Sequence, residues 1–437
     1  MNRSPLIFAA TCDPSGQVRG KAFPATERES RMNKGVGWVP TNSLITCFDT
    51  IAPSPFGALG DTVIVPDETA EISVNFGTDA PSERLALGDI CNLDGTPWAL
   101  CPRSILQSAL DRLDRVAGLQ VNAAFEHEFQ MPDLDLQPGE AFNYGAFAKN
   151  RDFGEALVAA MGDAGITPDT FLKEYGARQF EVTNAPSQGK TAADWAVLLR
   201  ELTKRLAHMM GHHASFVPII DPDGVGNGVH IHISFLDQQG APATYDKAHP
   251  FGMSQKTGSF IAGILKYLDS FLALTAPSDI SYMRLTPHRW SAAYNNLGYH
   301  DREAAVRICP VTATSEKKIA KQYNFEFRAA DAAASPYLAM AALVHAGAQG
   351  IEEKLPIPEV GQEDLSELDA QTLEARGYIR LPQSLSEALD RFEENDTVRS
   401  WFDPQFSDVY LAIKRAEIEH VKNMSDVEKC HLYSKVY

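Results

Sequence analysis

The sequence predicts a protein of the α+β class that is built from two parts. Strand-like runs separated by turn residues fill residues 6–97. From Pro102 onward, helical and strand-like segments are mixed without the regular strand–helix–strand alternation of a parallel sheet. Turn-rich sequence from Pro81 to Pro102 separates the two parts, so we expect one domain at residues 1–101 and a second at residues 102–437.

The composition is that of a globular protein with an acidic surface. Of the 437 residues, 44% are hydrophobic and 22% are charged, and the net charge is −18. This charge argues against nucleic acid as the main ligand, because proteins that bind the phosphate backbone need a basic surface. No apolar run approaches the ~20 residues that span a bilayer, so we expect no membrane contact and a cytoplasmic location.

The six cysteines are scattered along the chain and form no Cys-x-x-Cys pair. Such cysteines in a long acidic chain are typical of buried, reduced thiols, and we expect no zinc site from them. They are Cys12, Cys47, Cys91, Cys101, Cys309 and Cys430.

Two hairpins are expected in the first part. Residues 6–11 and 17–23 flank the turn sequence Asp-Pro-Ser-Gly, and residues 62–65 and 70–75 flank Pro-Asp-Glu.

The second part contains helices at helical apolar spacing and short strands. Ser104 is expected to cap the first helix, and Ser335 with Pro336 in the first turn begins a later one. The expected helices are 104–116, 154–164, 192–210, 335–350, 384–394 and 407–421, and the expected strands are 120–131, 178–183, 229–235 and 325–329.

Three of these strands carry polar residues two positions apart. The pairs are Glu126 with Glu128, His230 with His232, and Glu326 with Arg328. Residues two apart on a strand point to the same face, so a face that should bury apolar side chains presents charge instead. Burying charge is costly unless a metal or counter-charge offsets it. The three strands therefore predict one shared polar cavity that binds cations.

Other segments add to this pattern, although each has a simpler interpretation when taken alone. Glu174 and Glu181 bracket a glycine turn, and a Gly-x-Gly loop at Gly226 precedes the two histidines. Arg302 and Arg307 precede the third strand. Acids on an edge strand, a structural histidine and solvated arginines are the alternatives, and no P-loop or dinucleotide-binding glycine motif is present.

The order of these motifs resembles the glutamine synthetase superfamily over nearly the whole chain. The shared motifs are the Glu-x-Glu strand, the Gly-x-Gly loop with His-x-His, the Arg-x-x-x-x-Arg segment, and Glu-x-Arg-x-x-Asp followed by Ser-Pro-Tyr-Leu at residues 326–338. Residues 17–21 also resemble the Arg-Gly-Lys of the family's N-terminal domain. The branch that the chain resembles most is that of the γ-glutamylamine synthetases, which act on monoamines or polyamines.

This resemblance implies a fold and an assembly. We expect a small N-terminal β-grasp domain and a catalytic domain with a curved antiparallel sheet flanked by helices. The resemblance also implies a homo-oligomer, a dodecamer of two hexameric rings, whose active sites are shared between neighbouring N-terminal and C-terminal domains.

The resemblance also implies a role for each site residue. Glu128, Glu174 and Glu181 match the acids of one divalent cation, and Glu126, His230 and Glu326 match those of a second. Arg284, Arg328 and Gly226 match glutamate contacts, Arg302 and Arg307 match phosphate contacts, and His232 matches a nucleotide contact. Mg²⁺ or Mn²⁺, two or three per site, suits this oxygen-rich donor set, and ATP is the implied co-substrate.

The sequence departs from the family where ammonia is bound. Trp290 stands where ammonia-using members have a glutamate, and residues 38–42 replace a segment whose aspartate also holds ammonium, with Asp49 as a rival for that role. An indole in place of a carboxylate predicts an apolar-lined amine pocket, whereas a polyamine would need acids for its distal ammonium. Divergence of this loop without a role in specificity is the alternative.

The expected function is therefore an ATP-dependent ligase that joins glutamate to a small organic amine through γ-glutamyl phosphate. The alternatives are an ammonia-using glutamine synthetase, a polyamine-specific γ-glutamyl ligase, and a catalytically dead relative. The base that deprotonates the amine is open between Glu174, Asp61 of a neighbouring subunit and solvent.

Overall fold

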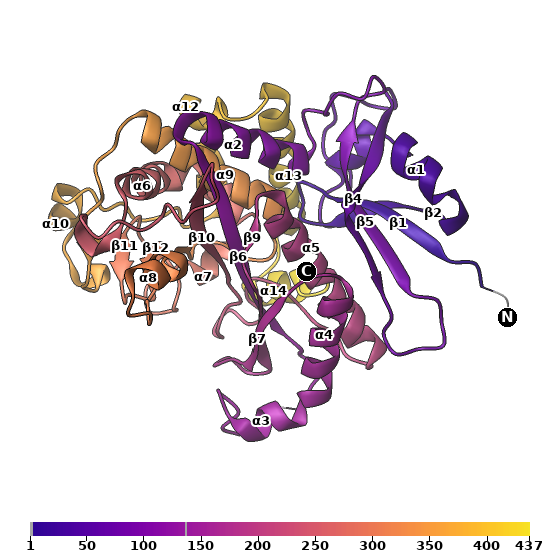
Figure 1. The fold of residues 1–437 in the computed structure, drawn as a ribbon, viewed down its shortest axis with the longest axis horizontal. Coiled ribbons are helices and arrows are strands. Elements are labelled where there is room, and N and C mark those ends of the chain that lie inside the picture. Colours follow the sequence, from indigo (N-terminus) through magenta and orange to yellow (C-terminus); the bar gives the residue numbers. More distant parts are fainter. Residues whose placement is uncertain (1–2, 136–137) are drawn as a thin grey trace.

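The structure, a computed structural model, describes residues 3–135 and 138–437; the first two residues of the expected N-terminal domain lie outside it. Two β-sheets divide the chain, one formed by strands before Cys91 and one by strands after Leu119. In Figure 1 the smaller sheet, coloured indigo to purple, lies beside the larger helical part.

The N-terminal sheet has five strands in the order β2-β1-β5-β4-β3. Its central strands β1 and β5 are parallel and its other neighbours are antiparallel, as the expected β-grasp fold requires. The hairpin of β1 and β2 confirms the first predicted hairpin. The elements are β1 (Leu6–Cys12), β2 (Val18–Pro24), η1 (Ala25–Glu27), α1 (Arg28–Lys34), β3 (Val36–Trp38), η2 (Pro40–Leu44), β4 (Thr62–Val74) and β5 (Glu83–Cys91).

The second predicted hairpin is wrong. Residues 62–74 form the single strand β4, and both halves of it pair with β5 across a register shift between Pro66 and Glu71. The turn-like Pro-Asp-Glu sequence is a bulge, the position where a sheet tolerates proline. Gly88 of β5 makes this approach feasible, because a Cβ there would lie 2.4 Å from the carbonyl oxygen of Val65.

The larger sheet follows the order β14-β11-β12-β13-β10-β6-β8-β7, and β9 pairs with β6. Its pairs are antiparallel except for β11 with β12 and β11 with β14. The strands are β6 (Leu119–Gln130), β7 (Pro168–Lys173), β8 (Gln179–Asn184), β9 (Ser187–Gln188), β10 (Val229–Asp237), β11 (Leu297–Tyr299), β12 (Val306–Ile308), β13 (Phe325–Phe327) and β14 (Val360–Gly361).

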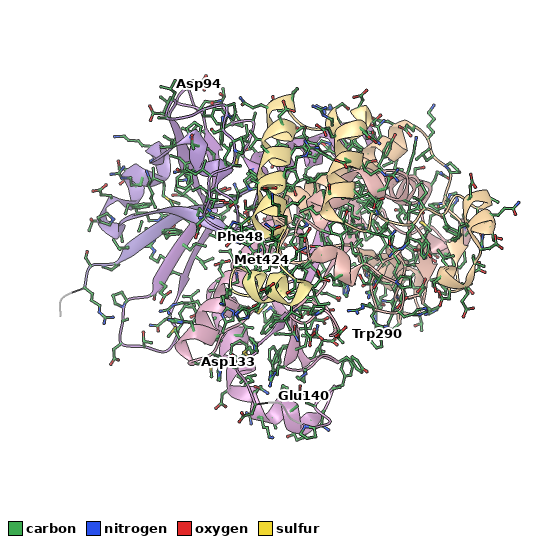
Figure 2. All side chains as sticks on the ribbon, turned by 180° about the vertical axis from the view of Figure 1, so that it is seen from behind. Phe48, Asp94, Asp133, Glu140, Trp290 and Met424 are labelled. Carbon is green, nitrogen blue, oxygen red and sulfur yellow. The ribbon has the colours of Figure 1, made fainter. Side chains whose placement is uncertain are left out.

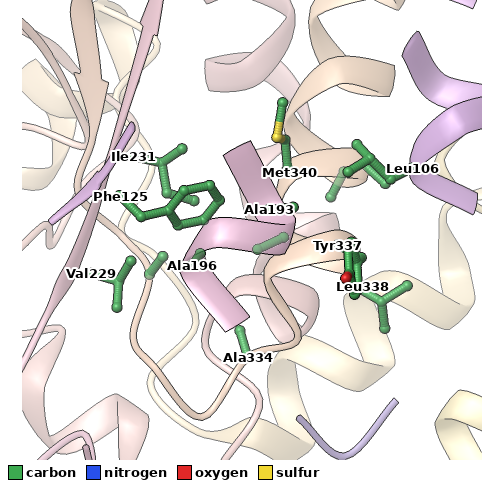
Figure 3. Packing of buried hydrophobic residues seen from close by; sticks show 14 of the residues in the cluster. Leu106, Phe125, Ala193, Ala196, Val229, Ile231, Ala334, Tyr337, Leu338 and Met340 are labelled. Atoms are coloured by element: carbon green, nitrogen blue, oxygen red, sulfur yellow. The ribbon is translucent and has the colours of Figure 1, made fainter. Parts of the chain in front are cut away.

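Helices cover the apolar face of this sheet. Figure 3 shows Phe125 and Ile231 of the strands close to Ala196 of α5 and Met340 of α9. The helices are α2 (Pro102–Ala117), α3 (Tyr144–Lys149), α4 (Arg151–Asp163), α5 (Lys190–Met209), α6 (Gln255–Thr275), α7 (Ser281–Arg284), α8 (Glu316–Gln322), α9 (Pro336–Glu352), α10 (Ala370–Ala375), α11 (Leu385–Glu394), α12 (Asp396–Arg399), α13 (Pro404–Val421) and α14 (Asp426–Tyr433), with the short turns η3 (Pro250–Gly252) and η4 (Leu365–Glu367).

Helix α2 begins earlier than expected, and the sequence did not predict the helices α1, α3, α6, α7, α8, α10, α12 and α14. Helix α2 begins at Pro102, and Ser104 lies inside its first turn, where its hydroxyl donates to Asp89 instead of capping the helix. Helix α6 was not predicted at all. It is long and apolar enough by length and composition to cross a membrane, but 89% of its most apolar window is buried within the protein, as in a core helix.

A buried arginine joins the N-terminal sheet to the helices of the second part. Arg103 of α2 is 1% exposed and donates to Asp194 of α5 and to two aspartates of the N-terminal sheet, Asp67 and Asp89, at 2.6–3.0 Å. Asp67 lies in the bulge of β4, so the irregularity of that strand supplies one of the charges that neutralise Arg103. All six cysteines are free and buried, as predicted.

The burial of His345 predicts a loss of stability in acid. Burial and the charge of Arg112 lower the pKa of His345 from 6.5 to about 3. Between these values the unfolded chain binds a proton and the folded protein does not, so the free energy of unfolding falls as the pH drops below about 6.5. Between about pH 7.5 and 5, we expect the free energy of unfolding of His345→Phe to fall by about 2 kcal/mol less than that of the wild type, as measured by chemical denaturation. The exposed His208→Gln variant is the control, and equal acid sensitivity in His345→Phe and the wild type would contradict the prediction.

Candidate active site

The site is the polar face of the larger sheet. Along β6, Phe125 and Phe129 point toward the helices and are buried, whereas Glu126 and Glu128 lie between them on the opposite face. The same alternation places Glu181, His230, His232, Glu326 and Arg307 on that face, each flanked by buried apolar neighbours on its own strand.

The register of the strands brings these residues into contact. Cross-strand partners are Glu128 with Glu181, Glu126 with His230, His232 with Glu326, and Arg307 with Glu326. Directly opposed side chains in an antiparallel pair share a face and lie within reach of each other. The predicted convergence of the three polar strands is therefore confirmed.

The polar side chains on this face form a row across the strands, and acids gather at one end of the row. Glu126, Glu181 and His230 offer ligand atoms that lie within 4.8 Å of one another, so Glu181 groups here with the two residues that the sequence analysis assigned to the other cation. Burial and the charges of Glu126, Glu128 and Glu174 raise the pKa of Glu181 to about 9. This repulsion is what a divalent cation would relieve.

The other end of the row is balanced by arginines. Oε1 of Glu326 accepts hydrogen bonds from Arg307 at 2.9 Å and from Arg328 at 2.8 Å, and its Oε2 lies 3.0 Å from Nε2 of His232. Burial opposes the ionisation of Glu326, but His232, His230 and Arg328 outweigh it and hold the pKa of this acid below its usual range.

His232 lies between two carboxylates. Its Nε2 is 2.9 Å from Glu126 and 3.0 Å from Glu326, and its Nδ1 is 2.9 Å from Oδ1 of Asn324. Burial alone would lower the pKa of His232, but Glu126 and the hydrogen-bond partners raise it well above its usual value. The ring thus links the two ends of the row.

A cavity of about 430 Å³ opens beside the acid cluster. Among the described residues, its lining includes Glu128, Glu174, Gly226, His230, Arg284 and Trp290 of the predicted set, together with Tyr175, Gln179 and Asp223, which the sequence analysis did not select. Arg302, Arg307 and Arg328 are outside that lining. Arg302 is exposed, and its carbonyl oxygen accepts from Nε of Arg328 at 2.9 Å.

Two glycines admit Arg284 to the cavity. A Cβ on Gly226 would lie 2.6 Å from the Arg284 side chain, and one on Gly228 would lie 3.1 Å from its Nη2. The guanidinium donates to Ser291 and to the carbonyl oxygen of Ala330, and its buried Nε has no hydrogen-bond partner in the described residues. Arg284 therefore retains a donor that a bound anion could use.

The backbone of Gly228 and the side chain of Gln179 position Glu128. Gly228 N–H donates to Glu128 Oε2 at 2.8 Å, and Gln179 Nε2 donates to the carbonyl oxygen of Gly226 at 2.9 Å. These contacts tie β6, β8 and the glycine loop together. The Glu128 side chain is therefore held in one position by the surrounding structure.

An aromatic pair forms the rim of the cavity. Trp290 and Tyr175 stack with ring centroids 5.6 Å apart and an interplanar angle of 19°, and each is 57% exposed. Figure 2 shows Trp290 at the outer surface of the larger, C-terminal part. Tyr175 is the cavity residue that sequence reasoning missed most clearly; its position beside Glu174 was the available signal.

Two half-buried and two exposed hydrogen bonds fix the loop that carries Trp290. Arg289 donates to the carbonyl oxygens of Pro222 and Gly224 at 2.8 and 3.0 Å. Glu303 accepts from the backbone N–H groups of His288 and Trp290, both at 3.0 Å. Trp290 has a positive φ of 54°, a conformation that these contacts hold in place.

The donor set fits a hard divalent cation. Glu126, Glu128, Glu181, Glu326 and His230 offer carboxylate oxygens and an imidazole on the polar face of the sheet, and Glu174 lines the cavity beside them. Burial and the neighbouring acids raise the pKa of Glu181. Mg²⁺ and Mn²⁺ prefer this chemistry. The assignment of each side chain to one ion stays a prediction.

Two family models match nearly the whole chain. The glutamine synthetase N-terminal domain matches residues 2–98, and the glutamine synthetase catalytic domain matches residues 99–433.

Curated relatives match over most of their length. The chain is 31% identical to gamma-glutamylpolyamine synthetase GlnA3 of Streptomyces coelicolor, over 96% of this chain and 91% of that protein. It is 29% identical to type-1 glutamine synthetase 1 of Dictyostelium discoideum, over 96% of this chain and 88% of that protein.

Solved structures share the fold. A crystal structure described as a novel glutamine synthase homolog superposes with a TM-score of 0.92 and 40% identity, over 100% of this chain and 99% of that one. A ligand-free structure of GmaS superposes with a TM-score of 0.82 at 22% identity, over 98% and 96% of the two chains, which is a likeness of fold.

The acid cluster predicts that metal binding depends on the negative charge of Glu181. Because the folded protein raises the pKa of Glu181 from 4.5 to about 9, this group destabilises the metal-free protein as the pH rises through that range. At about pH 8 and without metal, we expect Glu181→Gln to raise the melting temperature by at least ~2 °C and to abolish the increase that Mg²⁺ or Mn²⁺ gives the wild type. The exposed Glu155→Gln variant should do neither. A full metal-induced increase in Glu181→Gln would show that this acid is not a ligand.

Proposed function

The chain belongs to the glutamine synthetase family of ligases, and we propose that it joins glutamate to an organic amine, with ATP as co-substrate. The product is a γ-glutamyl amide, and the amine that the pocket suits best is a small monoamine. Both the specific reaction and its substrates are our proposal.

The observation that carries this proposal is the stack of Trp290 on Tyr175 at the rim of the cavity. Ammonium recognition needs a carboxylate to bind the cation and take its proton, and Trp290 stands at the position of that carboxylate. An indole paired with a phenol instead offers apolar surface to the carbon atoms of an amine, worth about 0.8 kcal/mol per buried CH₂.

The proposed chemistry has two steps. The γ-carboxylate of glutamate is a poor electrophile, so ATP first transfers a phosphoryl group to one of its oxygens. The amine nitrogen then attacks the γ-carbonyl carbon, phosphate leaves with the C–O bonding pair, and the amine loses a proton. When bound, Mg²⁺ or Mn²⁺ would neutralise the charge of the transferring phosphoryl group.

The residues have the following proposed roles. Arg284, whose Nε is free, and Gly226 bind glutamate together with Arg328. Arg302 and Arg307 act on the transferring phosphate, and His232 contacts the nucleotide. Arg307 and Arg328 already neutralise Glu326 in this structure, so that carboxylate would compete with substrate phosphate for Arg307 and with substrate glutamate for Arg328.

Two carboxylates of the cavity could take the proton of the amine. Burial and the charge of Glu128 raise the pKa of Glu174, which brings it closer to the range of a general base. Asp223 is exposed at the same cavity and adds a candidate that the sequence analysis lacked. Asp61 of a neighbouring subunit remains an alternative if the protein assembles into the proposed double-ring dodecamer.

A polyamine is the second candidate substrate, and a specific observation favours it. A cavity of about 560 Å³ adjoins the first one, since His288 lines both. Its lining is acidic and contains Asp301, Glu303, Glu363 and Asp364. These acids could hold a distal ammonium group, and the relative from Streptomyces coelicolor is described as acting on polyamines.

Two further alternatives are less well supported. Ammonia as substrate is disfavoured by Trp290, and a catalytically dead relative should have lost some of the acids and arginines that here line one face of the sheet.

An amine series tests the proposed substrate class. We measure ADP release with glutamate and ammonia, methylamine, ethylamine, longer monoamines and diamines. For a monoamine pocket, kcat/KM should rise about fourfold per methylene until the cavity is full, and a charged distal end should lower it. A preference for diamines would instead support a polyamine as the substrate. If no amine led to ADP release, the hypothesis of a catalytically dead relative would be supported.

The variant Trp290→Glu sharpens the same experiment. It restores a carboxylate at the rim, so the ratio of kcat/KM for ammonia to that for ethylamine should rise at least about tenfold over the wild type. Trp195→Phe, on α5, is the matched aromatic control. If ammonia is already the best substrate of the wild type, the aromatic rim has no role in specificity.

A substitution at Arg284 tests the glutamate site. Arg284→Lys keeps the charge but loses the planar fork, so we expect the KM for glutamate to rise about tenfold or more, with a smaller change in the KM for ATP. Arg328→Lys should also raise the KM for glutamate. An unchanged value would show that Arg328 serves only as the ion-pair partner of Glu326, and the exposed Arg151→Lys is the surface control.

A further inference from the structure

We propose that Cys309, His232 and Glu326 form a site for a soft divalent cation such as Zn²⁺ or Cd²⁺. One ligand atom from each of the three residues lies within 4.8 Å of the other two. The site shares Glu326 with the predicted second hard-cation position, so a soft cation bound there excludes the hard one and inhibits the enzyme.

The distance between the thiol and the imidazole fits such an ion. Cys309 directly follows β12, and its Sγ lies 3.5 Å from Nδ1 of His232 on β10. With Zn–S near 2.3 Å and Zn–N near 2.0–2.1 Å, tetrahedral coordination requires a sulfur–nitrogen separation of about 3.6 Å. The two side chains are thus already spaced for one shared ion.

The third ligand is the carboxylate of Glu326, in which only one oxygen is bonded to the two arginines. Oε1 of Glu326 is held by Arg307 and Arg328, whereas Oε2 lies 3.0 Å from Nε2 of His232. This Nε2 is on the other side of the ring from Nδ1, so the carboxylate must turn to reach a cation held by Nδ1 and Cys309. The two guanidinium groups neutralise this carboxylate, which weakens its purely electrostatic attraction for Mg²⁺. Bonds from a thiolate and an imidazole depend less on net charge and favour Zn²⁺ over Mg²⁺.

The position is buried but reachable. Glu326 and Cys309 are buried, while the side chain of His232 is 21% exposed and gives a cation a route from the polar face of the sheet. Binding needs no oxidant or reductant. The thiol of Cys309 and the imidazolium of His232 each release a proton to solvent as their lone pairs bind the metal, and Asn324 gives up its hydrogen bond to Nδ1.

Binding of Cd²⁺ tests the site without relying on the proposed reaction. Titrating Cd²⁺ into the metal-free, reduced full-length protein should produce an ultraviolet charge-transfer band from thiolate to metal. Cys309→Ser should lose this band and should weaken Zn²⁺ binding by calorimetry at least about tenfold, whereas the buried Cys91→Ser control should keep both. Cys309→Ala serves the same purpose if the serine variant does not fold.

Inhibition supplies the second readout. Zn²⁺ should inhibit Mg²⁺-dependent ADP release by the wild type, added Mg²⁺ should relieve it, and Cys309→Ser should keep its activity with Mg²⁺ while needing at least about tenfold more Zn²⁺. No charge-transfer band in the wild type, or equal Zn²⁺ sensitivity in Cys309→Ser, would overturn the proposal. Loss of ADP release with the Cd²⁺ band intact would instead count against the proposed function alone.

Discussion

The pairing register of β6 with its two neighbours is the constraint on which the site depends. It sets Glu128 opposite Glu181 and Glu126 opposite His230, while Phe125 faces the helical core. A slip of one residue would turn every acid into the core and every apolar side chain outward. The apolar face thus fixes the register, and the register in turn forces like charges together. The free energy of core packing is therefore what holds the carboxylates close enough to share a cation.

The sequence predicted this face because the pattern is local. Strand period alone groups Glu126 with Glu128 and His230 with His232, and the order of the motifs identified the family. The features that it missed join distant segments. The β4 bulge depends on pairing with β5 and on Gly88, Tyr175 meets Trp290 only in the folded chain, and the contact of Cys309 with His232 crosses from β12 to β10. No local pattern encodes these distances.

Rigid strands and an anchored loop divide the work of the site. The strands fix the groups that we propose to face phosphate and metal, whereas the rim that we propose to face the amine is a loop held by Arg289 and Glu303. Sequence change on the strands would break the core alternation, but change at Trp290, which is 57% exposed, would not. In the proposed function, substrate preference can therefore diverge within this architecture while the polar face of the sheet stays the same.

The buried Arg103 has a consequence for exchanging modules between relatives. Its guanidinium is neutralised partly by Asp194 of the catalytic part and partly by Asp67 and Asp89 of the N-terminal sheet. A chimera could take its N-terminal sheet from a relative without the two aspartates. The buried guanidinium of Arg103 would then lack part of its counter-charge, a defect that typically lowers stability by about 3–5 kcal/mol. Whether the two parts of such a hybrid are compatible thus depends on three carboxylates, and not on the overall fit of their surfaces.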